Sequence, residues 1–174
     1  MIGKFIESFP DAKVIHIVRD PRDVITSLMG RDKHLLDGAE AWVASLAAIS
    51  PYRRSKQVIE LRYEDLCRQP DQALSSVCDF LGVEFDTGYF YSDEHVSKEL
   101  GKFEGHDSWK VRPNEAFTTK SIGRHKDKGM DWGPVSQIRL TKQYADLLGT
   151  KQWSLGELAQ AYGYELENNP DKPD

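Results

Sequence analysis

The segment from residue 12 to residue 28 constrains the fold most, because an apolar run there passes directly into a helix start. Residues 12–18 (AKVIHIV) hold four β-branched residues with apolar side chains on both faces, which is typical of a strand buried in a parallel sheet. Asp20 then suits an N-cap, Pro21 suits the first helical position, and Asp23 adds a negative charge in the first turn. The sequence therefore predicts strand, abrupt turn and helix, which is half of a β-α-β unit.

The rest of the chain predicts one more strand and several helices. Residues 57–63 (QVIELRY) predict the second strand. Apolar residues at helical spacing predict helices over 39–49, 70–81, 138–148 and 155–162. Residues 86–133 show no period, so we expect irregular surface structure there, and loops of that length in a compact domain are usually functional or mobile.

Two strands are too few for an independent parallel sheet, which needs more strands and helices on both faces. We therefore expect an α/β fold that is N-terminally incomplete, with an exposed apolar sheet edge. Such an edge favours self-association, so we expect the isolated chain to be oligomeric or poorly stable. The domain is expected to span residues 1–167, followed by a frayed tail over residues 168–174.

Composition limits the class of partner. The 174 residues carry 23 Lys and Arg against 28 Asp and Glu, a net charge of -5, which lacks the overall field of a nucleic-acid binder. No apolar run approaches the ~20 residues that span a bilayer. The two cysteines, Cys67 and Cys78, cannot form a disulfide framework or a complete zinc site. These features favour a cytoplasmic protein, with the Golgi lumen as the alternative if an anchor precedes this sequence.

The strand-to-helix junction is the candidate binding site. Ligands of open α/β sheets bind beyond the carboxyl ends of strands, where helix N-termini offer free N–H groups. Arg19 stands at that position, and Ser27 follows two helical turns later, so the two could converge on one anion. The alternative is that Arg19 only pairs with Asp20 or Asp23, as surface charges often do.

At these residues the sequence resembles the sulfotransferases that use 3′-phosphoadenosine 5′-phosphosulfate (PAPS). The segment 9–27 (FPDAKVIHIVRDPRDVITS) looks like their 3′-phosphate-binding segment. Three shorter blocks follow in the family's order: 62–66 (RYEDL) with the following Pro and Phe-Leu-Gly, then 120–124 (KSIGR), then 162–164 (YGY). The resemblance implies a three-layer α/β sandwich with a parallel sheet, like that of the P-loop nucleoside triphosphate hydrolases.

The resemblance also implies a set of binding residues. Arg19 and Ser27 match the family's 3′-phosphate ligands, and Tyr63 matches a tyrosine that contacts the adenine region. Gly123 and Arg124 match the loop that closes over the 3′-phosphate. Tyr63 at a strand end could equally be a core residue. PAPS is the implied co-substrate, and no metal is expected.

Two parts of the family pattern are missing from the sequence. The loop of Lys, Gly and Ser or Thr that cradles the 5′-phosphosulfate is not present, and neither is a convincing general base. His16 lies within the predicted buried strand and is interpreted as a core histidine. His34, His95, His106 and His125 lack the spacing of metal ligands and are given no role, and the catalytic residues stay unassigned.

The sequence thus predicts a partial sulfotransferase domain that carries the 3′-phosphate-binding part. The full enzyme would transfer a sulfuryl group from PAPS to a hydroxyl or amine acceptor, and this chain alone is expected to be inactive. One alternative is a fragment of a P-loop-type kinase. The other is a non-catalytic helical interaction module with Trp109, Trp132 and Trp153 as exposed anchors.

Overall fold

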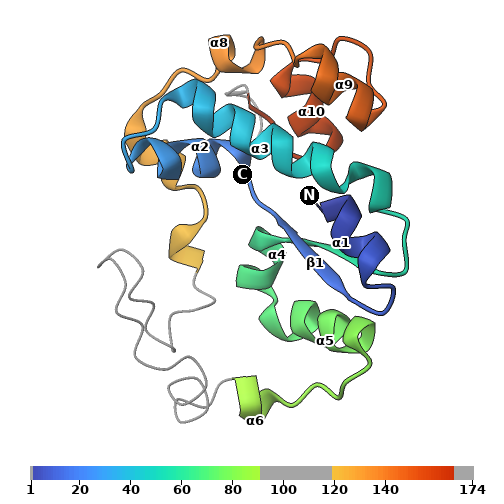
Figure 1. Cartoon of the computed structure of the whole chain (residues 1–174). Helices are drawn as coiled ribbons and strands as arrows, with labels where there is room; N and C mark the ends of the chain where they lie inside the picture. The colour runs from blue at the N-terminus through green and yellow to red at the C-terminus, as the bar shows by residue number, and fades with distance from the viewer. Residues whose placement is uncertain (1, 91–118, 167–174) are drawn as a thin grey trace. The chain divides into compact units, whose positions relative to one another are not determined.

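The computed structural model describes residues 2–90 and 119–166 (Figure 1). In chain order the elements of the first part are α1 (Ile2–Ser8), β1 (Val14–Val18), α2 (Pro21–Met29), α3 (Leu35–Ile49), the 3₁₀ helix η1 (Ser50–Tyr52), β2 (Val58–Arg62), α4 (Tyr63–Arg68), α5 (Pro70–Leu81) and α6 (Thr87–Phe90). The second part holds η4 (Thr119–Ser121), η5 (Arg124–Lys128), α8 (Gly133–Ser136), α9 (Lys142–Leu148) and α10 (Leu155–Ala161).

The chain divides into two compact units. The first unit comprises residues 1–60 and 122–174, and the second comprises residues 61–121. The expected single domain over 1–167 stays a prediction, and the expected frayed tail lies outside the described residues.

Strands β1 and β2 form a small parallel sheet, which is two-stranded within the described residues. The chain between them contains α2 and α3, so the connection is the helical crossover that parallel neighbours require. At the start of the pair the Val14 N–H donates to the Gln57 carbonyl at 2.7 Å. The predicted strand, turn, helix and second strand are therefore confirmed.

Strand β1 is not buried on both faces, which corrects the sequence prediction. Ile15 and Ile17 are 42% and 50% exposed, whereas Val18 is 3% exposed. The physical reason is the two-residue period of a strand: the side of His16 meets Ser45 of α3, and Ile15 and Ile17 project to the other side. The exposed apolar surface is thus a strand face, and self-association through a sheet edge stays a prediction.

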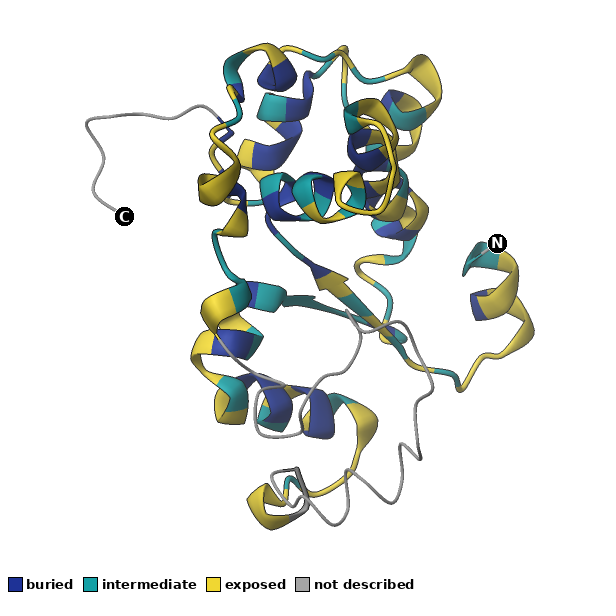
Figure 2. Ribbon diagram, turned by 90° about the vertical axis from the view of Figure 1, so that its left-hand side faces the viewer, coloured by how far each residue is buried: buried dark blue, intermediate teal, exposed yellow. Residues whose placement is uncertain are grey.

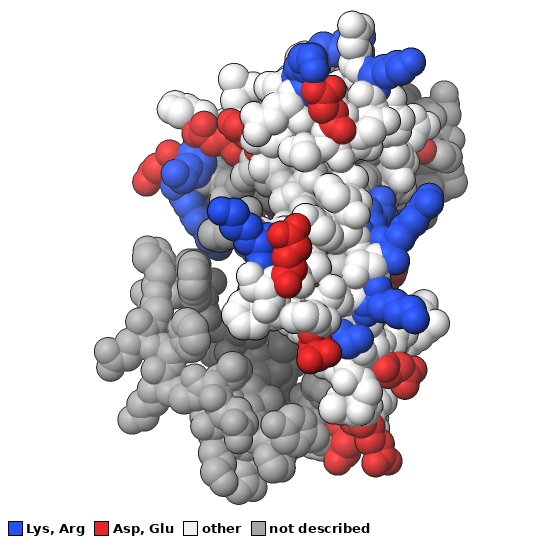
Figure 3. Space-filling model, turned by 45° about the vertical axis from the view of Figure 1, so that its right-hand side comes forward, with Lys and Arg blue, Asp and Glu red and all other residues white. Residues whose placement is uncertain are grey.

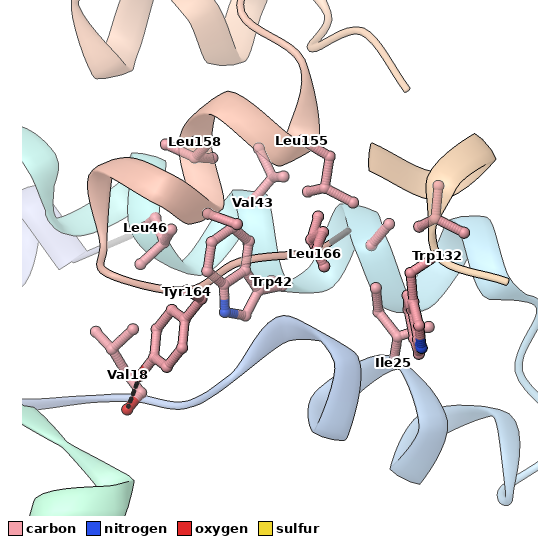
Figure 4. Packing of buried hydrophobic residues seen from close by; sticks show 13 residues of the cluster. Val18, Ile25, Trp42, Val43, Leu46, Trp132, Leu155, Leu158, Tyr164 and Leu166 are labelled. Atoms are coloured by element: carbon pink, nitrogen blue, oxygen red, sulfur yellow. Dashed lines mark hydrogen bonds between the residues drawn. The ribbon is translucent and has the colours of Figure 1, made fainter. Parts of the chain in front are cut away.

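The main hydrophobic core belongs to the first unit and is shown in Figure 4. Its buried members are Val18, Ile25, Ala39, Trp42, Val43, Leu46, Trp132, Val135, Leu155, Leu158, Ala159, Tyr164 and Leu166. The buried residues of α3 and α10 recur at helical spacing, and Figure 2 colours buried residues dark blue. Helices α2 and α3 approach closely at Gly38, because glycine has no side chain there. A Cβ on Gly38 would lie only 3.1 Å from the Ile25 Cα. This core holds the carboxyl end of β1 in place.

The tryptophans expected as exposed anchors do not form such a surface. Trp132 is 2% exposed and belongs to the core, and Trp153 is half-buried and packs against it. Trp109 lies outside the described residues. The indole rings of Trp132 and Trp153 pack in or against the core because burying a large aromatic side chain is strongly favourable in free energy.

The second unit is built on α4 and α5. Helix α5 spans the predicted residues 70–81, and Gly82 ends it in the left-handed conformation with φ +75°. Its inward stripe contains Ala73, Leu74, Val77 and Cys78. The sequence did not predict α4, because six residues directly after a strand show less than two turns of periodicity.

The described ends of the irregular stretch, 86–90 and 119–133, hold short helices and turns, and residues 91–118 lie outside the description. None of the described helices is both long and apolar enough to cross a membrane. On the face drawn in Figure 3, acidic and basic side chains are interspersed. That distribution agrees with the modest net charge.

Candidate functional site

The backbone at the end of β1 is fixed by two side chains of the core. The Tyr164 hydroxyl donates to the Val18 carbonyl at 3.4 Å, as Figure 4 shows, and Trp42 Nε1 donates to the Arg19 carbonyl at 2.9 Å. The Val18 carbonyl belongs to the last residue of β1 and the Arg19 carbonyl to the residue after it, where backbone groups need partners other than the ladder. Arg19 therefore leaves the strand from a rigid position.

Asp20 caps α2 as the sequence predicts. Its Oδ1 accepts from the Arg22 N–H at 2.8 Å, and Pro21 occupies the first helical position. The Arg22 guanidinium binds the same carboxylate twice, Nε to Oδ1 at 3.1 Å and Nη2 to Oδ2 at 2.8 Å. A bidentate pair of this kind sets the orientation of both side chains.

Asp23 lies at the centre of the junction and is fully buried in its side chain. Its Oδ2 accepts from Arg19 Nη2 at 3.2 Å and from the Gly123 N–H at 2.9 Å. Its Oδ1 accepts from the His125 N–H at 3.0 Å and from His125 Nδ1 at 2.8 Å. One carboxylate thus joins the end of β1, helix α2 and the loop at residues 123–125.

The ionised form of Asp23 is strongly favoured. Burial alone would raise the pKa of this carboxyl, but the hydrogen bonds from the His125 side chain and backbone and from Gly123, with the Arg19 charge, lower it further than burial raises it. The net result is a pKa well below the ordinary value of 3.8. Asp23 is therefore an anion that accepts hydrogen bonds and does not donate them.

The loop that reaches Asp23 has a local reason for its shape. Gly123 has φ +75°, in the left-handed region that glycine adopts without steric cost, and η5 begins at the next residue. Arg124 is exposed, whereas His125 is 4% exposed and its ring meets Trp132 edge-on at 6.1 Å between centroids. The loop therefore buries His125 and leaves the Arg124 side chain accessible to solvent.

The structure brings together part of the predicted site. Arg19 and Gly123 bind the same carboxylate, and Arg124 lies between the two residues of the loop that bind it. Ser27 is exposed on α2, one helical turn beyond Asp23 and on the same face. Tyr63 belongs to the second unit, where it is half-buried and begins α4.

Two members of the site were missed by sequence reasoning. Asp23 was interpreted as a first-turn helix charge or as an ion-pair partner of Arg19, not as part of the binding site, and His125 was given no role. The pairing of Arg19 with Asp23, weighed as an alternative to an anion site, is present. The contact between Asp23 and His125 joins residues 102 positions apart, and nothing in the local pattern around either residue signals it.

His16 is half-buried and takes part in a polar chain, which corrects its interpretation as a core residue. Its Nδ1 lies 3.1 Å from Glu60 Oε2 and its Nε2 lies 3.1 Å from Ser45 Oγ. The order serine, histidine, carboxylate is that of a catalytic triad. Ser45, however, lies in the interior of α3, where neighbouring N–H groups are engaged within the helix and offer no oxyanion hole. This chain of bonds therefore links β1, β2 and α3 as a structural element.

A separate hollow of about 500 Å³ lies beside α8 and α10. Its wall includes Ser136, Glu157 and Tyr164, and it is not lined by the residues of the Asp23 cluster. The hollow and the predicted site are therefore different places on the first unit.

The family model described as the sulfotransferase family matches residues 1–87, which is half of the chain and includes β1, α2 and β2. No curated protein matches the chain.

The solved structures that match the chain include two sulfotransferase domains. The sulfotransferase domain from the Synechococcus PCC 7002 olefin synthase is 22% identical, with a TM-score of 0.54 over 88% of this chain and 50% of that one. The sulfotransferase domain from the curacin biosynthetic pathway is 22% identical, with a TM-score of 0.49 over 89% of this chain and 54% of that one. The chain spans about half the length of each. The first of these likenesses supports the expected α/β fold, and because the family model covers half of the sequence, the chain belongs to the sulfotransferase family.

Proposed function

We propose that this chain carries the 3′-phosphate-binding part of an enzyme that transfers a sulfuryl group from PAPS to a hydroxyl or amine acceptor. The observation that carries the proposal is the attachment of Arg19 and of the loop Gly123–His125 to one carboxylate, at the carboxyl end of β1. Membership of the sulfotransferase family supports PAPS as the sulfuryl donor, and the junction lies within the matched residues 1–87. The segment 9–27 around the junction also resembles the family's 3′-phosphate-binding segment.

The chemistry of the junction suits a phosphate. An arginine offers a planar fork of donors with a permanent charge, which matches phosphate oxygens better than an ammonium does. The two carboxylates of the junction are each bound by an arginine, Asp20 by Arg22 and Asp23 by Arg19. These ion pairs reduce the repulsion between the two carboxylates and a bound phosphate. The exposed Arg124 adds a positive charge to the loop.

The proposed reaction is a displacement at sulfur. The acceptor oxygen or nitrogen forms a bond to sulfur while the bond from sulfur to the 5′-phosphate oxygen breaks, and the acceptor proton passes to a base. The products are the sulfated acceptor and adenosine 3′,5′-bisphosphate. The residues assigned here bind and orient the nucleotide at its 3′ end, and the base stays unassigned. Inactivity of this chain by itself stays a prediction.

The first test is nucleotide preference. We expect the chain to bind adenosine 3′,5′-bisphosphate at least tenfold more tightly than adenosine 5′-monophosphate, because only the former carries the 3′-phosphate that Arg19 would bind. Calorimetry at fixed, low salt is the measurement, since salt screens exposed phosphate contacts. Equal affinities would contradict the proposal, and a preference for ATP over both would favour the kinase alternative.

Ser27 should make a smaller contribution than Arg19. Removing a neutral hydroxyl donor costs about 0.5–1.5 kcal/mol, so Ser27→Ala should weaken binding of adenosine 3′,5′-bisphosphate by roughly two- to tenfold. Binding of adenosine 5′-monophosphate should not change. Ser76→Ala is the matched control, because Ser76 is also an exposed helical serine but lies on α5 of the second unit. If Ser76→Ala weakened binding of the bisphosphate as much as Ser27→Ala, the assignment of Ser27 as a 3′-phosphate ligand would be contradicted.

A further inference from the structure

The carboxylate of Asp23 receives four hydrogen bonds from two separate stretches of chain, the end of β1 and the loop at residues 123–125. Two come from the Arg19 guanidinium and the Gly123 N–H, and two come from the backbone and the side chain of His125. All four are donors, and the carboxylate has two oxygens with lone pairs for about four of them. Its acceptor capacity is therefore matched by the donors that surround it.

Through these donors Asp23 restrains the guanidinium of Arg19 and the backbone beside Arg124. Its bond to Arg19 Nη2 restrains the guanidinium that leaves the end of β1. Its bonds to the N–H groups of Gly123 and His125 hold the backbone on both sides of Arg124. The carboxylate that orients Arg19 therefore also fixes the position of the backbone from which the exposed Arg124 side chain extends.

We propose that Asp23 is the positioning residue of the 3′-phosphate site, and that His125 is the side-chain arm through which the loop reaches it. This inference rests on the proposed function. A negative charge beside an anion site opposes binding by itself, so its contribution must be geometric. Restraining the Arg19 guanidinium and the backbone that carries Arg124 before the ligand arrives reduces the entropy lost on binding.

The hydrogen-bond partner of His125 sets its tautomer. Because an ionised carboxylate only accepts, the Nδ1 atom of His125 carries the proton that is donated to Oδ1. Nε2 is buried and has no hydrogen-bond partner among the described residues. Asparagine places an amide N–H near the position of Nδ1, whereas glutamine places one near Nε2. The two substitutions therefore separate the bond to Asp23 from the mere presence of a polar side chain.

The experiment combines nucleotide affinity with amide hydrogen exchange on the whole chain. In Asp23→Asn one acceptor oxygen becomes an NH₂ group that faces other donors, so the loop loses its bond from Gly123 or its bonds from His125, whichever oxygen is replaced. We expect the variant to bind adenosine 3′,5′-bisphosphate at least tenfold more weakly. Without nucleotide, the Gly123 and His125 amides should exchange at least tenfold faster than in the wild type. Binding of adenosine 5′-monophosphate should stay within twofold.

Asp20→Asn is the matched control, because Asp20 is a second buried carboxylate at the same helix end but is bound by Arg22. It should leave both the exchange of the loop amides and the preference for the bisphosphate unchanged. His125→Asn should keep the affinity within about threefold, and His125→Gln should lose more than that. This pair retains Asp23, so it tests the inference even if Asp23→Asn does not fold.

The outcomes separate the inference from the function on which it rests. If the wild type does not prefer the bisphosphate, the proposed function fails, and the positioning role fails with it. If the wild type shows the preference but a folded Asp23→Asn variant binds equally well, the function stands and the positioning role is overturned. Equal affinities of His125→Asn and His125→Gln would overturn the role given to His125.

Discussion

Replacing Arg19 with alanine is expected to weaken binding of adenosine 3′,5′-bisphosphate by about ten- to a hundredfold. A hydrogen bond to a charged group contributes about 1.5–3 kcal/mol, and the guanidinium would face a phosphate from a fixed backbone position. That position is secured by Trp42, which binds the Arg19 carbonyl and not the side chain, so truncation leaves the anchor intact. Calorimetry at low salt with both adenosine nucleotides measures the effect.

Two further variants decide what Arg19 does. Arg19→Lys keeps the charge but loses the planar fork, and should lie between the wild type and Arg19→Ala. Arg53→Ala is the control, since Arg53 also pairs with a carboxylate of the first unit, that of Glu60, but stacks on the Tyr162 ring away from the Asp23 cluster. Equal losses for the bisphosphate and the monophosphate with Arg19→Ala would mean that Arg19 supports the fold and does not bind the 3′-phosphate.

The sequence predicted the elements whose signals are local. The apolar run of residues 12–18, Asp20 and Pro21 together specify strand, cap and helix start within ten residues, and the structure has all three. Helix α5 was predicted with its correct ends because Pro70 and Gly82 each carry a backbone preference of their own. Such signals act through neighbouring residues and need no knowledge of tertiary packing.

The candidate site was predicted only in part, because its centre depends on tertiary contact. Arg19 was identified from its position at the end of the predicted strand and the Gly123–Arg124 pair through a family resemblance, but the Asp23 carboxylate that joins them was not identified as part of the site. Asp23 appears in the sequence as an ordinary first-turn acid, and its burial follows only when the loop a hundred residues later covers it. The exposure of Ile15 and Ile17 has the same origin, since a strand's own residues do not reveal which of its faces is covered.

Acid is expected to destabilise the fold through Asp23. The pKa of this carboxyl is lowered on folding, so its contribution is complete above the ordinary value of 3.8 and is lost as the pH falls from there toward the folded-state pKa. Breaking a buried, hydrogen-bonded ion pair costs about 3 kcal/mol or more. The free energy of unfolding from urea titrations should therefore be about 3 kcal/mol lower for Asp23→Asn than for the wild type at pH 7.

The difference between the two proteins should shrink below about pH 4, because the unfolded wild type then takes up a proton that the folded protein resists. Asp146→Asn is the control, since Asp146 forms an exposed ion pair with Lys142 and should change stability by about 0.5 kcal/mol or less at every pH. A gap between wild type and Asp23→Asn that stays constant from pH 7 to pH 3 would show that the charge of Asp23 is not its source. The side chain would then stabilise the junction by packing alone, and the matched set of four donors around it would have no energetic consequence.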